Sequence, residues 1–450
     1  MSIIETKLGK IEGIDKNGYT LFAGVPFAKP PVGEFRWKAP VAVEPWEGVK
    51  KATEFAPICP QDEAAPPNPY FREFYDYEGY KREQSEDCLY LNIWMPENAA
   101  GKKLPVALFI HGGAFAGGYS SEIEFDGEAV CKKDVIYVSI AYRLGVFGFL
   151  ALPQLDAEND RGISGNYGIL DQIMALNWVY DNIESFGGDK DNITVFGQSA
   201  GCMSTQILIS SDLTKGKIAK AFLMSGITCD DKFLATPTLK EEEQYCKEML
   251  GKYADYTAEQ LREIDVERLL NKFRMYNMIQ MENSMTEGGN EGGFLIVPNV
   301  DGYVLKKSVR DVYRDGEFHK IPYIVGCVTD DLGTTPKDKN EHTPGLLFDQ
   351  AKKWAIRQLE VGNTDAFVYW FDRTLPGDNA PTWHSLDLWY VMGTYNKSWR
   401  PMTTDDAAIS DEILSAWTNF CKTGNPEGPG ESEWKPYTKE NQFVKIFGRL

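Results

Sequence analysis

The sequence predicts an α/β fold in which a mostly parallel sheet is covered by helices on both faces. Short apolar runs with strand character alternate along the chain with segments of helical periodicity, as is typical of such a sheet. The run Leu104 to Ile110 is continuously apolar, as expected for a strand buried on both faces. A Gly-x-Ser-x-Gly motif at residues 197–201 joins another such run to helix-compatible residues, which indicates a sharp turn from strand into helix.

The N-terminal part of the chain predicts short antiparallel strands. Residues 6–13 and 19–22 have strand character and are separated by the turn signal Asp-Lys-Asn-Gly. A proline-rich extended loop follows, and residues 85–94 then alternate apolar and polar side chains as a strand does. Residues 57–85 are irregular and rich in tyrosine and phenylalanine, and a loop of this length is usually functional, disordered or held by contacts.

The remaining elements follow from apolar runs and helical stripes. We expect further strands and helices at these positions: strands 135–142, 192–196, 219–224, 321–326 and 366–371, and helices 169–178 and about 406–422. Residues 231–290 are charged and helical, with methionines at helical spacings, namely Met275, Met278, Met281 and Met285. The simplest interpretation of this stripe is a core face, and the alternative is an adaptable lining for an apolar ligand pocket. Because no internal repeat or linker composition interrupts the chain, we predict a single domain over residues 1–450.

Composition excludes several classes of function. The 450 residues carry a formal net charge of −19, which argues against a nucleic-acid-binding face and would attract a cationic ligand. The first residues lack the basic and apolar regions of a signal peptide, so we expect a cytoplasmic location. No stretch approaches the about 18 apolar residues that span a membrane. The eight cysteines and four histidines form no metal-binding pattern, so neither a metal nor a cofactor is expected.

The motif at residues 197–201 makes Ser199 a candidate nucleophile. Serine hydrolysis needs a base that accepts the serine proton, a carboxylate that orients the base, and backbone N–H donors for the oxyanion. In a fold with this elbow the expected chain order is serine, acid, histidine. The alternative is a strand, turn and helix that carry a serine by chance.

The candidate base is His384. It alone among the histidines follows a late strand through a loop and precedes an apolar segment, residues 386–391. The candidate acids are Asp330 and Asp331, which follow the strand expected at residues 321–326. Adjacent carboxylates on a loop point in different directions, and residue chemistry alone does not choose between them. A surface-loop histidine and an Asp-rich turn are the structural alternatives.

The candidate oxyanion donors lie in two places. The loop Gly112 to Phe115 follows the strand at residues 104–110, and its small residues would let backbone N–H groups approach a substrate oxygen. Ala200 follows the serine at the start of a helix, where the helix dipole would reinforce its N–H group. A simple Gly-rich turn is the alternative for the loop. A phosphate cradle is disfavoured because no Gly-Lys-Ser/Thr follows.

Together these motifs resemble the type B carboxylesterases, a family of α/β-hydrolases that includes para-nitrobenzyl esterases and cholinesterases. The matching segments share their order along the chain, and they are residues 22–40, 85–92, 111–115, 166–172, 186–189 and 197–201. The resemblance implies an α/β-hydrolase fold with an N-terminal antiparallel edge and helical insertions. It also implies Ser199 as nucleophile, His384 as base, and Gly113, Ala114 and Ala200 as oxyanion donors.

The chain departs from this family at the acid and in the aromatic loop. The family usually has Asp-Glu-Gly at the acid position, and alignment from Gly326 places Asp331 there, one methylene shorter than glutamate. Cholinesterase-like members carry a tryptophan in the aromatic loop, but residues 60–87 contain none, so choline recognition is not supported. The resemblance also implies a disulfide between Cys59 and Cys88 in exported relatives. Without a signal peptide we expect reduced thiols here.

The sequence therefore predicts a serine esterase that acts on a small-molecule carboxylic ester through an acyl-Ser199 intermediate. Two alternatives stay open: amide or thioester cleavage at the same site, and a non-catalytic recognition protein on the same fold. The sequence indicates neither the acyl and alcohol groups of the substrate nor the oligomeric state.

Overall fold

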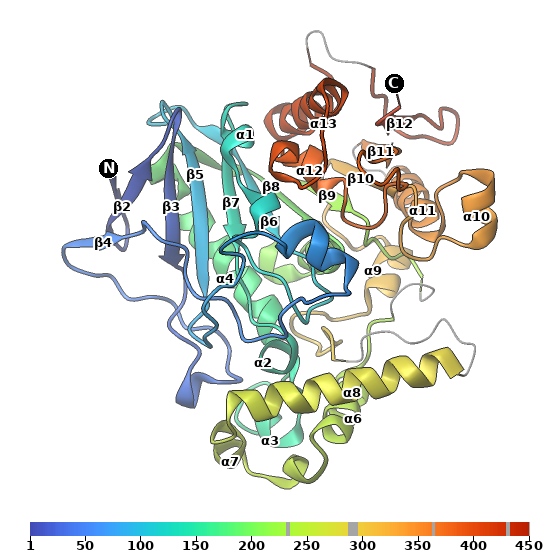
Figure 1. Ribbon diagram of the computed structural model, residues 1–450. Helices are drawn as coiled ribbons and strands as arrows, with labels where there is room; N and C mark the ends of the chain where they lie inside the picture. Colours follow the sequence, from blue (N-terminus) through green and yellow to red (C-terminus); the bar gives the residue numbers. More distant parts are fainter. Residues whose placement is uncertain (231–234, 287–295, 362–364, 429–432, 450) are drawn as a thin grey trace.

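The computed structural model describes residues 1–230, 235–286, 296–361, 365–428 and 433–449. Its centre is a 12-stranded sheet in the order β1-β2-β3-β5-β7-β6-β8-β9-β10-β11-β12, with β4 paired to β2 (Figure 1). The strands have these bounds: β1 (Ser2–Thr6), β2 (Gly9–Asp15), β3 (Tyr19–Pro26), β4 (Val49–Lys51), β5 (Tyr90–Pro96), β6 (Leu104–Ile110), β7 (Ile136–Ile140), β8 (Gly188–Gln198), β9 (Lys220–Met224), β10 (Tyr323–Val328), β11 (Ala366–Phe371) and β12 (Val444–Phe447).

The sheet is antiparallel from β1 to β7 and parallel from β7 to β12, and β4 pairs parallel with β2. The pairs β1–β2, β2–β3, β3–β5 and β5–β7 run antiparallel. From β7 through β6, β8, β9, β10 and β11 to β12 every pair is parallel. The carboxyl ends of these parallel strands meet at one edge of the sheet, which is where sites form in open α/β folds.

Helices cover both faces of the sheet (Figure 1). Their bounds are α1 (Glu128–Cys131), α2 (Gly145–Phe149), α3 (Pro153–Asp156), α4 (Tyr167–Asn182), α5 (Ala200–Leu208), α6 (Leu239–Leu250), α7 (Ala258–Arg262), α8 (Val266–Thr286), α9 (Val309–Asp315), α10 (Pro336–Glu341), α11 (Leu346–Glu360), α12 (Leu388–Val391) and α13 (Thr404–Thr423). Buried residues of α4, α5 and α11 belong to one apolar cluster, and those of α12 and α13 belong to another. No helix in the described part of the chain is long and apolar enough to cross a membrane.

Most predicted elements are present with small changes in their bounds. β6 and β11 coincide with the predicted strands, and α4 extends the predicted helix at both ends. The antiparallel N-terminal edge is confirmed. The aromatic loop contains a π-helical turn, η2 (Phe71–Tyr75), which the sequence did not indicate.

The prediction of a methionine core face on residues 275–285 is wrong where the side chains are described. Met275 and Met278 lie on α8 with exposed fractions of 61% and 57%. The buried side chains of this helix include Leu269, Leu270 and Phe273, which lie nearer its start. The side chains of Met281 and Met285 lie outside the described residues. Helical spacing identified a common face, but that face is directed to solvent at its two described positions.

Candidate active site

Ser199 stands at the junction between β8 and α5. Its backbone has φ 58° and ψ −126°, a conformation that a residue with a Cβ rarely adopts. The flanking glycines are required by packing. A Cβ on Gly197 would lie 2.4 Å from the backbone of Gly201, and a Cβ on Gly201 would lie 2.0 Å from the carbonyl oxygen of Ile110. The local sequence thus holds the serine on a strained, closely packed elbow.

His384 and Asp331 form a buried hydrogen-bonded pair. His384 lies in the segment after β11, Asp331 lies in the loop after β10, and Nδ1 is 2.5 Å from Oδ1. The carboxylate also accepts hydrogen bonds from the N–H groups of Val328 and Leu332. Burial raises the pKa of Asp331, but the charge and hydrogen bond of the imidazole outweigh this effect, and the pKa lies below its usual value. The ionised carboxylate favours the His384 tautomer with Nδ1 protonated and an acceptor at Nε2.

The other sequence candidates lie apart from this pair. Asp330 forms an ion pair with Lys339 at 2.7 Å, and its backbone N–H donates to the carbonyl of Thr382. His342 lies 3.0 Å from a carboxylate oxygen of Asp372. Between the two adjacent aspartates, the structure therefore brings only Asp331 into contact with His384.

Gln198 precedes Ser199 in the chain, contacts His384 through its side chain, and is not among the predicted site residues. Its Nε2 is 3.3 Å from His384 Nε2, and its Oε1 accepts a hydrogen bond from the Ser385 hydroxyl at 3.0 Å. Since His384 Nε2 is the acceptor nitrogen, the amide N–H of Gln198 is its natural donor. Within the described residues no hydrogen bond joins Ser199 Oγ to His384. The only sequence signal for Gln198 is its position directly before the serine.

The loop after β6 passes next to the serine. A Cβ on Gly112 would lie 3.1 Å from the Cβ of Ser199, so the two backbones are in close contact. Gly113, Ala114 and Phe115 have φ of 99°, 57° and 60°, and a Cβ on Gly113 would lie 2.0 Å from the carbonyl oxygen of Gly117. The left-handed backbone turns this loop sharply over the elbow. In the described structure the N–H groups of Gly113, Ala114 and Ala200 have no hydrogen-bond acceptor.

His111 holds the loop in this orientation. Its ring is buried, stacks on Tyr142 at 4.5 Å, and places Nδ1 2.9 Å from the carbonyl oxygen of Gly112. Burial lowers the pKa of His111 to about 4, so the ring is neutral at pH 7. The Gly112 carbonyl and the Gly113 N–H belong to one trans peptide unit and point in opposite directions. Binding the carbonyl to His111 therefore directs the N–H of Gly113 away from that ring.

A cavity of about 590 Å³ contains both Ser199 and His384 in its lining. The loop after β6 contributes Gly112 to Ala114, and the aromatic loop contributes tyrosine and phenylalanine side chains. Two buried glutamates, Glu122 and Glu124, also line it. No sequence motif identifies these glutamates, which lie in and next to a 3₁₀ turn (Ile123–Phe125) beyond the Gly112 to Phe115 loop.

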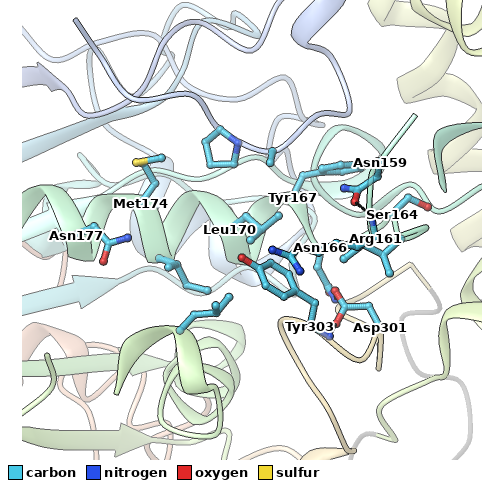
Figure 2. A pocket seen from close by; sticks show the side chains of 15 residues that line it. Asn159, Arg161, Ser164, Asn166, Tyr167, Leu170, Met174, Asn177, Asp301 and Tyr303 are labelled. Atoms are coloured by element: carbon cyan, nitrogen blue, oxygen red, sulfur yellow. Dashed lines mark hydrogen bonds between the residues drawn. The ribbon is translucent and has the colours of Figure 1, made fainter. Parts of the chain in front are cut away.

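A second cavity, of about 330 Å³, lies elsewhere and contains none of the predicted site residues (Figure 2). It is lined partly by α4, and Asn166 donates a hydrogen bond of 2.8 Å to Asp301 there. Arg161 lies over the ring of Tyr303 at 4.0 Å. These contacts connect the start of α4 to the segment before α9.

Cys59 and Cys88 are both buried and free in this structure. Burial and contact with Cys59 raise the pKa of Cys88 well above its usual value, with the Cys59 hydrogen bond as the larger cause. Both residues lie at the ends of the aromatic loop, as the sequence indicated.

Residues 1–344 and 345–448 match the family model described as the carboxylesterase family. The chain belongs to this family. The para-nitrobenzyl esterase of Bacillus subtilis (strain 168) is 32% identical over 99% of this chain and 94% of its own length. The fumonisin B1 esterase of Sphingopyxis macrogoltabida is also 32% identical, over 98% of this chain and 85% of its own length. This carboxylesterase is therefore a carboxylic ester hydrolase.

Solved carboxylesterase structures share the fold. A para-nitrobenzyl esterase superimposes with a TM-score of 0.82 at 31% identity, covering 99% of this chain and 96% of the other. The Geobacillus stearothermophilus carboxylesterase Est55 gives 0.79 at 30% identity, covering 99% and 96%. The expected α/β-hydrolase fold is confirmed.

Proposed function

We propose that this carboxylesterase hydrolyses its ester through a covalent acyl-Ser199 intermediate, with His384 as the base and Asp331 as the acid. The observation that carries this proposal is the 2.5 Å contact of Asp331 with His384, which lines the same cavity as Ser199. A buried carboxylate that fixes an imidazole beside a strained serine elbow is the arrangement that nucleophilic acyl transfer needs. The substrate would be a small carboxylic ester.

The reaction would begin when the Ser199 hydroxyl turns toward His384 Nε2 and displaces the amide of Gln198. His384 removes the hydroxyl proton as Oγ attacks the ester carbonyl, and it then gives that proton to the departing alcohol. A water molecule, deprotonated by the same nitrogen, attacks the acyl group; the bond to Oγ breaks, His384 returns the proton to Ser199, and the carboxylic acid product is released. Asp331 stabilises the imidazolium in both halves of the reaction and keeps its charge throughout.

The oxyanion would be bound by the backbone N–H groups of Gly113, Ala114 and Ala200. These three donors have no acceptor of their own in the described structure. The N–H of Ala200 is at the start of α5, where the helix dipole adds to the attraction for negative charge. Preorganised donors of this kind each contribute about 3 kcal/mol to transition-state binding.

The test is the Ser199→Ala variant with p-nitrophenyl butyrate as substrate, together with labelling of the native enzyme by a fluorophosphonate. We expect the variant to lose at least about 10³-fold in kcat and to lose labelling. Ser210→Ala is the matched control, because this hydroxyl lies near the end of α5 and bonds to Gln206. Ester turnover that survives in Ser199→Ala would refute the mechanism. Faster cleavage of matched anilides or thioesters would instead assign amidase or thioesterase activity to the same residues.

A further inference from the structure

Two buried carboxyl groups lie in the lining of the cavity that holds Ser199. Glu122 and Glu124 have exposed fractions of 6% and 1%, and both contribute to that lining. The proposed reaction uses neither of them. Burying a carboxylate is costly unless hydrogen bonds or a cation compensate, so their surroundings indicate what they bind.

The hydrogen bonds around this carboxyl pair are incomplete. Glu122 accepts the backbone N–H of Tyr119 at 2.7 Å and the hydroxyl of Tyr75 at 3.0 Å. Burial, followed by the negative charge of the neighbouring Glu122, disfavours ionisation of Glu124 and raises its pKa well above the usual value. Burial raises the pKa of both groups, and that of Glu124 more strongly. The second oxygen of Glu124, Oε2, has no partner.

A third buried glutamate shows how the protein usually compensates a buried carboxylate. Glu73, with an exposed side-chain fraction of 2%, forms an ion pair with Arg400 at 2.9 Å. The indole N–H groups of Trp389 and Trp399 also donate to it. Every oxygen of Glu73 is therefore bound by a donor from the protein. The pair Glu122 and Glu124 has no protein cation in contact, so its missing donor is absent from the described chain.

The other groups around the cavity favour a cation at this pair. The rings of Tyr75, Tyr119 and Phe125 belong to the same lining, and aromatic faces attract cations. The cavity lining also has two basic residues, but in the described structure neither is paired with Glu122 or Glu124, and Nε of Arg82 has no hydrogen-bond partner. Lys81 forms an ion pair with Glu63 at 2.9 Å, and the guanidinium of Arg82 lies 5.6 Å from the ring of Phe55.

We propose that the carboxyl pair of Glu122 and Glu124 binds a protonated amino group of the substrate, so that the enzyme prefers carboxylic esters carrying a primary amine. This inference rests on the proposed function, since it makes the pair a specificity site in the cavity of Ser199. An ammonium group offers several N–H donors to Glu122 and to the unpartnered Oε2 of Glu124. It also supplies the positive charge that the buried pair lacks, and charge-assisted hydrogen bonds are the strongest available.

The test compares three inhibitors of equal length: hexylammonium, 1-hexanol and hexanoate, at pH 7. Each is titrated as a competitive inhibitor of p-nitrophenyl butyrate hydrolysis. We expect hexylammonium to bind at least about tenfold more tightly than 1-hexanol, and hexanoate more weakly than either. If hexanoate binds best, the cavity instead recognises an anion through Arg82, and the proposal is wrong. Equal binding of hexylammonium and 1-hexanol also overturns it.

Glu124→Gln and Glu122→Gln keep the side-chain shape but remove the acid. Each should weaken hexylammonium binding by about tenfold while 1-hexanol remains an inhibitor, which shows that the cavity is still folded. Glu78→Gln is the matched control, because Glu78 is exposed on the aromatic loop and does not line the cavity. Unchanged hexylammonium binding in both cavity variants would overturn the proposal. If native enzyme fails to hydrolyse any ester, the proposed function fails, while hexylammonium binding is still measurable by calorimetry.

Discussion

The adjacent aspartates Asp330 and Asp331 have different contacts in the folded protein. Asp330 and Asp331 follow the same strand, but Asp331 is buried against His384 and Asp330 is bound to Lys339 on the outer side of the loop. The backbone N–H groups of Val328 and Leu332 close around Asp331, so its carboxylate is fixed before any substrate binds. Two carboxylates one residue apart are therefore expected to differ in their effects on catalysis.

Asp331→Asn should lower kcat by about 10³- to 10⁴-fold, because an amide no longer favours the tautomer of His384 that accepts a proton at Nε2. Asp330→Asn breaks only a partly exposed ion pair and should change kcat by less than about threefold. Both are measured as initial rates with p-nitrophenyl butyrate at pH 7. A larger loss in Asp330→Asn than in Asp331→Asn would reverse the proposed roles.

A second buried aspartate near this pair makes stability depend on pH. Burial, followed by the negative charge of Asp331, raises the pKa of Asp387 to about 7 from the ordinary value of 3.8. The folded state therefore binds this proton more tightly than the unfolded state. Its contribution to stability is full below about pH 4 and is lost as the pH rises through 7.

The asparagine of Asp387→Asn cannot ionise, so the variant should not lose stability as the pH rises through 7. Relative to native enzyme, the variant should gain roughly 2 kcal/mol in free energy of unfolding between pH 5 and pH 8. Urea unfolding at the two pH values measures the difference, with Asp160→Asn at an exposed position as control. A pH-independent difference between Asp387→Asn and native enzyme would contradict a titrating Asp387.

At the scale of elements, a buried ion pair helps to hold the aromatic loop against the rest of the fold. Glu73 lies in η2 and pairs with Arg400, which lies between α12 and α13, so the loop is anchored to the helical cover of the sheet. Removing one partner of a buried ion pair leaves the other charge uncompensated. Glu73 and Arg400 do not line the cavity themselves, but their ion pair positions the aromatic loop, which does.

Glu73→Ala should reduce the free energy of unfolding by about 3 kcal/mol and make residues 57–85 sensitive to limited proteolysis. Glu63→Ala removes a partner from an ion pair on the same loop, but its side chain is 47% exposed and that of Lys81 is 62% exposed. We expect the control to cost less than about 1 kcal/mol. Equal losses in the two variants would show that Glu73 does not anchor the loop.

The sequence predicted the bounds of two fully buried strands correctly. It did not predict features that depend on contacts between segments far apart in the chain. β6 and β11 are continuous apolar runs, so their bounds follow from composition alone. Glu73 of η2 contacts Arg400, which lies 327 residues later in the chain, so a local sequence pattern could not predict this turn. The exposed methionines of α8 have the spacing of a core face, and spacing does not reveal which neighbour covers a helix. Glu122 and Glu124 belong to no motif, and only the fold brings them into the lining of the cavity that also contains Ser199.

At the scale of the whole molecule, the net charge of −19 creates a field that attracts cations before they reach the cavity. This field acts over distances set by the ionic strength, with a screening length of about 10 Å at 0.1 M salt. The carboxyl pair acts only on contact, and its burial shields it from salt. The rate at which an amine-bearing ester reaches the cavity should therefore fall with salt, whereas its binding to the carboxyl pair should depend little on salt.

We expect kcat/KM for 6-aminohexyl acetate to fall by about threefold or more when ionic strength rises from about 10 to 200 mM. Hexyl acetate, which is neutral, should show no such change when both reactions are followed by titration of released acid. In Glu124→Gln the cationic ester should have a higher KM, but the salt dependence should persist, because the remaining surface charge still steers it. An equal decline for hexyl acetate would attribute the salt effect to the protein's conformation, and the loss of salt dependence in Glu124→Gln would place the steering charge in the cavity itself.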